Sequence, residues 1–110
     1  MTQLEQLEQE LANSKDLIAT RQAALRLYQN RDFKKIILEG FCLKDAARFV
    51  QVSQDPAVSK PEQEDALRMA QASGHLKRFL SMQVQMGAHA ERTLPQLEEA
   101  IEEVRAEGGE

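Results

Sequence analysis

The residues most often found at catalytic and metal-binding centres are scarce in this sequence. Cys42 is its one cysteine, and His75 and His89 are its two histidines. A nucleophilic cysteine needs a base beside it, and neither histidine is near Cys42 along the chain. The histidines lie 14 residues apart, about four turns of one helix, so one chain could not place both on the same ion. The sequence therefore predicts no catalytic cysteine and no metal site.

Acidic residues near the end of the sequence are the remaining candidates for ligand chemistry. Glu98 and Glu102, like Glu99 and Glu103, are four residues apart, so each pair would share one helix face. Carboxylate pairs can hold a divalent cation, but without a histidine or an inward-facing position they indicate a solvated surface. The sequence has no glycine-rich phosphate loop. We therefore expect a protein that is not an enzyme, with no catalytic residue, no cofactor and no bound metal.

The composition indicates an all-α protein. Of the 110 residues, 42% are hydrophobic and 29% are charged, in a mixture rich in Ala, Leu, Glu, Gln, Lys and Arg that is typical of long helices. The single cysteine excludes an intrachain disulfide and fits a reducing cytosol. No apolar stretch approaches the ~18 residues of a membrane span, and the acidic, polar beginning is unlike a secretory signal. We expect one helical domain over residues 1–107 and a flexible end at 108–110.

Hydrophobic periodicity and capping signals predict two long helices with two short helices between them. Thr2 with Glu5, and Ser59 with Glu62, have the spacing of capping boxes, one before each long helix. Folded back on each other, the long helices would form a coiled-coil-like hairpin. The four helices are expected at about residues 3–30, 32–40, 43–53 and 60–106.

Three residues mark expected breaks in these helices. Asp32 is a suitable N-cap for the first short helix, and Gly40 is a natural residue just past its end. Pro95 lies inside the last helix, but the heptad pattern continues beyond it. We therefore expect a kink near Pro95 and not a change of direction.

The hydrophobic stripes of the two long helices are narrow. A two-helix stem with such stripes buries little surface, so dimerising or docking on a partner is the economical way to complete the core. The second stripe narrows to small residues at Gly87 and Ala90, where another helix could approach closely. The candidate interface residues are Leu4, Leu7, Leu11, Ile18, Leu25, Leu80, Gly87, Ala90, Leu94, Leu97, Ile101 and Val104.

Charge is distributed unevenly along the chain. The net charge is −4, which gives no general reason to expect nucleic-acid binding. The middle of the chain is nevertheless basic, and its end is a run of glutamates. Such charges form a solvated face more often than a binding site, so a contact with protein, a contact with nucleic acid and plain solvation stay open. The candidate basic patch consists of Arg26, Arg31, Lys34, Lys35, Lys44 and Arg48.

Residues 43–53 also have the pattern of the first helix of a helix-turn-helix, with charged residues and an Ala-Ala pair before an apolar pair and a polar turn. Two features oppose DNA binding by such a motif. The connection over residues 54–59 is longer than the usual turn of roughly three or four residues. The next helix would begin with Glu62, Glu64 and Asp65, whose carboxylates would repel phosphates.

Three stretches of the sequence carry a resemblance to known proteins. NRDFKKIILEGF at 30–41, then DAAR at 45–48 and VQMG at 84–87, resemble a family of small helical proteins encoded by tailed bacteriophages. The resemblance runs over most of the chain. Members are encoded near head and packaging genes and mostly have no assigned role, so the resemblance implies a phage structural or assembly component. It supplies no catalytic residues.

The leading hypothesis is a non-enzymatic structural or assembly protein of a tailed phage. It would act through its helices, by forming a homo-oligomer or by docking on a larger phage structural protein. One alternative is a DNA-binding or packaging accessory similar to a small terminase subunit. Another is an inhibitor that binds a host protein through the acidic C-terminal helix. We expect no membrane partner and a location in the host cytoplasm during assembly, with retention in the virion left open.

Overall fold

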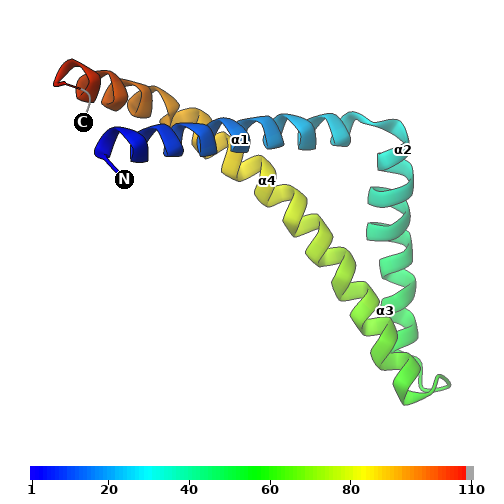
Figure 1. The fold of residues 1–110 in the computed structure, drawn as a ribbon. Helices are drawn as coiled ribbons and strands as arrows, with labels where there is room; N and C mark the ends of the chain where they lie inside the picture. The colour runs from blue at the N-terminus through cyan, green and yellow to red at the C-terminus, as the bar shows by residue number, and fades with distance from the viewer. Residues whose placement is uncertain (109–110) are drawn as a thin grey trace. The chain divides into compact units, whose positions relative to one another are not determined.

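The computed structural model describes residues 1–108, and every secondary-structure element in that range is helical (Figure 1). A long helix lies at each end of the described chain, and shorter helical segments lie between them, which confirms the predicted all-α class. The elements are α1 Gln3–Gln29, α2 Arg31–Phe33, η1 Lys34–Asp45, α3 Ala46–Gln54 and α4 Lys60–Ala106.

Both long helices begin at the predicted capping residues. The backbone N–H of Glu5 donates to Thr2 Oγ1 at 3.1 Å, and the Thr2 N–H donates to Glu5 Oε2 at 3.2 Å. This reciprocal pair satisfies donors that the first helical turn leaves without partners. At the start of α4, the Glu62 N–H donates to Ser59 Oγ at 3.4 Å. Local side-chain chemistry therefore determines where α1 and α4 begin.

The break between α1 and α2 is set by Asn30, and the expectation that Asp32 is the cap was wrong. Asn30 is extended, with φ −73° and ψ 124°, and its Oδ1 accepts the Phe33 N–H at 2.9 Å. Asp32 lies inside α2. An extended residue whose side chain reaches the N–H three positions later is the geometry of an N-cap, and Asn is among the best residues for it.

Replacing this cap should weaken the short helices. We expect Asn30→Ala to lower the free energy of unfolding by about 1 kcal/mol, because the Phe33 N–H loses its acceptor. Asn30→Asp keeps an oxygen in the same place and should change stability by less than about 0.5 kcal/mol. Urea unfolding followed by circular dichroism measures both. Equal stability of the two variants would show that the Asn30 side chain does not cap α2.

The chain is helical without a break from Arg31 to Gln54, so the predicted end at Gly40 was also wrong. Gly40 lies inside η1, a π-helix, in which each N–H bonds five residues back; at its end the Ala46 N–H reaches the Phe41 carbonyl. A Cβ on Gly40 would lie 3.2 Å from the Lys35 carbonyl oxygen. Gly40 therefore lies within the helix and does not end it.

The last helix continues through Pro95, as predicted. Proline cannot donate a backbone hydrogen bond. Two residues earlier the Thr93 hydroxyl donates to the His89 carbonyl at 3.2 Å. The helix ends at Ala106, and Gly108 follows with φ 111°, a conformation that favours glycine. The flexible end expected at 108–110 falls largely on residues 109–110, which lie outside the described residues.

The contacts between Cα atoms divide the chain into two compact units. Unit 1 comprises residues 1–25 and 82–110, and unit 2 comprises residues 26–81. In unit 1, α1 and the C-terminal part of α4 run antiparallel, because Arg21 pairs with Glu91 at 3.6 Å and Glu8 pairs with Arg105 at 3.1 Å. The buried side chains of unit 1 are those of Ala24, Ala90, Ile101 and Val104.

Unit 2 is a second antiparallel helical pair. Its first half is the arm, which we define as the segment Arg31–Gln54, and its second half is the beginning of α4. Cys42 Sγ lies 3.9 Å from the Ser73 carbonyl oxygen, and near the loop the Gln63 amide donates to the Asp55 carbonyl. The buried residues of unit 2 are Cys42, Ala66, Ser73 and Leu80.

Candidate functional site

The cysteine and the histidines do not come together in the structure. Cys42 is buried in unit 2, where its sulfur contacts the Ser73 backbone. His75 and His89 are both exposed. In residues 1–108, no group of three or more Cys, His, Asp or Glu side chains is placed to hold a metal ion. The same residues contain no helix long and apolar enough to cross a membrane.

The predicted interface residues lie mostly where helices of this chain already meet. Ile101 and Val104 are only 3% and 6% exposed in unit 1. Gly87 is buried as well, whereas Leu25 is exposed. The stripe therefore packs helices of this chain against each other. Its half-buried members are the ones that could also contact a partner. The remaining members are Leu80 and Ala90, which are buried, and Leu4, Leu7, Leu11, Ile18, Leu94 and Leu97, which are half-buried.

Arg21, which interrupts the α1 stripe in the sequence, is fitted against Gly87. A Cβ on Gly87 would lie 2.2 Å from Arg21 Cβ and 2.7 Å from the Leu17 carbonyl oxygen. The Arg21 Nε is buried and has no hydrogen-bond partner among the described residues, while its terminal nitrogen pairs with Glu91. The glycine thus admits a long charged side chain at a point where α1 and α4 nearly touch.

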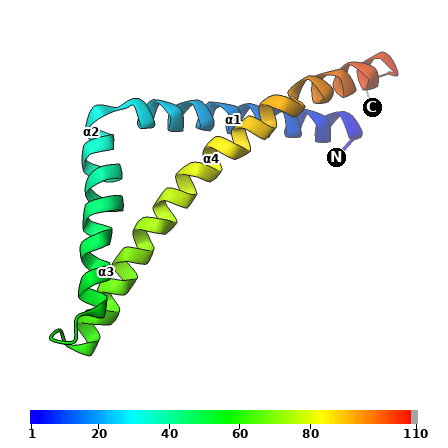
Figure 2. The same cartoon turned by 180° about the vertical axis from the view of Figure 1, so that it is seen from behind.

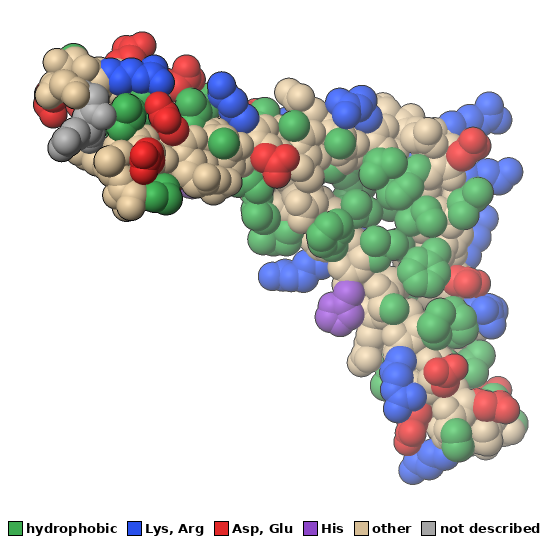
Figure 3. Space-filling model, in the orientation of Figure 1, with side chains coloured by type: hydrophobic (Ala, Val, Ile, Leu, Met, Phe, Trp, Pro, Cys, Tyr) green, Lys and Arg blue, Asp and Glu red, His purple; other side chains and the backbone are tan. Residues whose placement is uncertain are grey.

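Large apolar side chains remain exposed on unit 2, and sequence reasoning missed them. Ile36 is 64% exposed, and Leu43 in the same arm is 63% exposed. On α4, Phe79 is 59% exposed. Figure 3 shows hydrophobic side chains gathered over the arm and the first part of α4. We define the apolar surface by its members Ile36, Leu43, Val50, Leu67 and Phe79.

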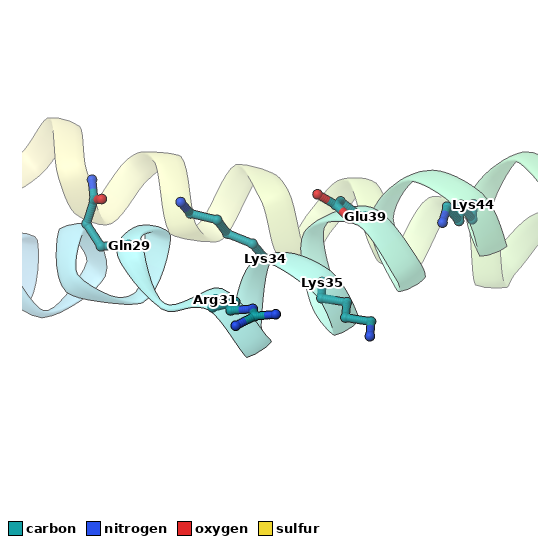
Figure 4. Close-up of a pocket in the computed structure, with 6 residues that line it drawn as sticks. All are labelled: Gln29, Arg31, Lys34, Lys35, Glu39 and Lys44. Atoms are coloured by element: carbon teal, nitrogen blue, oxygen red, sulfur yellow. The ribbon is translucent and has the colours of Figure 1, made fainter.

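A basic surface lies on the same arm. Arg31, Lys34, Lys35 and Lys44 are all exposed. With Gln29 and Glu39 they border an open hollow of about 370 Å³. Figure 4 shows Arg31 and Lys35 extending to one side of the arm and Lys34 to the other. We call these four residues the basic surface; they border an open hollow and not a pocket that encloses a small ligand.

The two other members of the predicted basic patch differ from these four. Arg48 is engaged locally, 3.4 Å from Asp45 and with its guanidinium 4.4 Å from the centre of the Phe49 ring. Arg26 is exposed near the end of α1 and does not border the hollow. Four of the six candidate residues therefore border the hollow.

Opposite charges are segregated between the two units. Unit 2 contains ten Lys and Arg against seven Asp and Glu, a formal charge of +3. Unit 1 contains four against eleven, a formal charge of −7. Its exposed glutamates Glu98, Glu99, Glu102 and Glu103, which we call the acidic end, account for more than half of that excess.

Neither charged surface is neutralised by the described chain. Ion pairs within residues 1–108 include no member of the basic surface and no member of the acidic end. The pairs that do form are Arg21 with Glu91, Arg48 with Asp45 and Arg105 with Glu8.

The segment considered as a helix-turn-helix has a different geometry. α3 and the beginning of α4 lie side by side and run in opposite directions, joined by the loop at residues 55–59 (Figures 1 and 2). Two contacts flank α3 along the chain: Cys42 of η1 contacts Ser73 of α4, and Asp55 of the loop accepts from Gln63 of α4. A helix-turn-helix instead crosses its helices at about 90–120°. These two helices therefore form a hairpin.

Comparisons with known proteins add no relative from which a function could be transferred. No protein-family model, no curated protein and no solved structure matches the chain. The function must therefore be inferred from the surfaces described above.

Proposed function

We propose that this chain is a non-enzymatic assembly protein that acts through surface contacts with a second copy of itself or with a larger structural protein. The resemblance to small helical proteins of tailed phages makes that larger protein a virion component. The proposal accounts for the two unpaired charged surfaces and for the apolar surface of unit 2.

The observation that carries the proposal is the exposure of the apolar surface. No side chain in residues 1–108 is less than 2% exposed, so the two helical pairs bury little of their own apolar area. Full burial of a Leu or Ile side chain contributes about 1.5–3 kcal/mol. With Ile36 and Leu43 each more than 60% exposed, covering them would supply a large part of the free energy of a stable contact.

Association of the purified protein tests this proposal. We expect sedimentation velocity to show a concentration-dependent oligomer. The double variant Ile36→Ser/Leu43→Ser should weaken its dissociation constant at least about tenfold, since tenfold corresponds to only about 1.4 kcal/mol. Met86→Ser, which removes an exposed apolar side chain of unit 1, is the matched control and should leave association unchanged.

Docking on a phage particle is tested by a separate measurement. Mass spectrometry of purified phage particles, or of complexes captured from infected cells, should find the chain with a virion protein. A folded monomer at every concentration that also copurifies with no virion protein would contradict the proposed function.

A further inference from the structure

We infer that the basic surface of one copy receives the acidic end of a second copy. This inference rests on the proposed self-association and names the two surfaces that make the contact. Both are exposed, and neither forms an ion pair within residues 1–108. They belong to different units of the chain, with formal charges of +3 and −7.

The acidic end is unfavourable for the helix that contains it. Glu98 and Glu102, and likewise Glu99 and Glu103, place like charges four residues apart on one helix face, which is destabilising. Glu103 also lies in the last turn of α4, which ends at Ala106, and Glu102 directly precedes it. Negative charge there opposes the helix dipole. A cationic partner would offset both penalties; Arg105 lies in the same last turn but pairs with Glu8.

The basic surface has the opposite mismatch. Arg31, Lys34 and Lys35 follow directly after the N-cap Asn30. Positive charge in the first turns of a helix opposes the dipole, just as negative charge does in the last turns. The acidic end is therefore complementary to the basic surface in side-chain charge and in helix polarity. The exposed Ile36 and Leu43 lie within the same stretch, so such a contact would also cover apolar area.

Charge favours a second copy over nucleic acid as the occupant. Binding to DNA is dominated by phosphate neutralisation, and unit 2 has an excess of only three positive charges. A second copy instead contains the matching surface.

The contact joins two different surfaces, and this determines the kind of oligomer that forms. Each copy bound through its acidic end still has a free basic surface, and the reverse is true of its partner. Such head-to-tail contacts continue until a ring closes or an open chain forms. We therefore expect association to continue past the dimer.

Charge reversal of the full chain tests this contact. Lys34→Glu/Lys35→Glu changes the basic surface, and Glu98→Lys/Glu102→Lys changes the acidic end. Each variant alone should associate at least about tenfold more weakly than the original chain, because attraction is replaced by repulsion. An equimolar mixture should recover association, since each variant again meets its complement. Sedimentation velocity at about 0.1 M salt provides the readout, and association should weaken clearly at about 1 M salt, where charges are screened within about 3 Å.

Matched variants separate this contact from a general effect of net charge. Lys60→Glu/Arg68→Glu makes the same charge change elsewhere on unit 2, and Glu10→Lys/Asp16→Lys does so on α1; all four residues are exposed. Both controls should associate like the original chain. If they weaken association equally, or if the mixture recovers nothing, the inferred contact is wrong.

Two further outcomes overturn the inference in distinguishable ways. In the first, association is unaffected by salt and by charge reversal but is lost in Ile36→Ser/Leu43→Ser. That result would contradict the inferred contact and leave the proposed function intact. A salt-dependent shift of a DNA duplex that is lost in Lys34→Glu/Lys35→Glu but retained in Glu98→Lys/Glu102→Lys assigns the basic surface to nucleic acid instead.

Discussion

Gly87→Ala should lower the free energy of unfolding by about 2 kcal/mol or more, although alanine is the better helix former. The new methyl group would lie 2.2 Å from Arg21 Cβ and 2.7 Å from the Leu17 carbonyl oxygen. Neither atom is the end of a flexible side chain, so α1 and α4 must separate at this point. Overpacking of this kind costs typically 1–3 kcal/mol and sometimes more, against a gain in helix propensity of about 1 kcal/mol.

Gly74→Ala is the matched control, because Gly74 also lies within α4 but a Cβ there would meet nothing within 4 Å. That substitution should stabilise the protein by about 0.5–1 kcal/mol through helix propensity and the loss of unfolded-state freedom. Thermal unfolding should therefore show shifts of opposite sign, with roughly 4–8 °C for each kcal/mol in a domain of this size. A stabilising effect of Gly87→Ala would mean that the helices of unit 1 are not in close contact at residue 87.

The long helices could be predicted from the sequence because their signals are local. The Thr2–Glu5 and Ser59–Glu62 spacings specify hydrogen bonds within one turn, and the structure contains them. The continuation of the last helix through Pro95 could also be predicted, since the apolar repeat continues on both sides of this residue. Such features depend on neighbours within about four residues and not on the rest of the chain.

The arm was harder to predict because its signals compete. Asn30 and Asp32 are both good caps, and only the extended backbone of Asn30 decides between them. Gly40 is typical of a helix end, but it lies inside the π-helix η1. A sustained π-helix is rare, and hydrophobic periodicity analysed at the α-helical repeat does not reveal it.

The candidate surfaces were predicted in part. The basic patch was visible because exposed lysines and arginines on one segment are a compositional signal. The apolar surface was not, because Ile36 has the same residue type and helical spacing as core positions. Only tertiary contacts show that the arm packs on α4 through Cys42 and not through Ile36. The Arg21–Gly87 fit has a sequence signal in hindsight, namely a glycine in one stripe and a charge that interrupts the other.

Ile101→Ala should destabilise the protein by about 2–5 kcal/mol, the usual range when a buried isoleucine is truncated. Ile101 is 3% exposed, and its neighbour on the same face, Val104, is 6% exposed. The other buried side chains of unit 1 belong to Ala24 and Ala90, which are too small to move into the space that is left. Unit 1 therefore depends on very few large side chains to keep its two helices together.

Ile36→Ala makes the same chemical change at a residue that is 64% exposed. It should alter stability by less than about 0.5 kcal/mol, measured by urea unfolding at a concentration where the protein is monomeric. At concentrations where the proposed oligomer forms, Ile36→Ala should weaken association, whereas Ile101→Ala should act first through loss of the unit 1 fold. Equal losses of monomer stability in the two variants would show that the arm faces α4 differently, because the two isoleucines would then be equally buried. The opposite ranking of these variants in the two assays separates residues that hold the fold together from residues left free to bind another molecule.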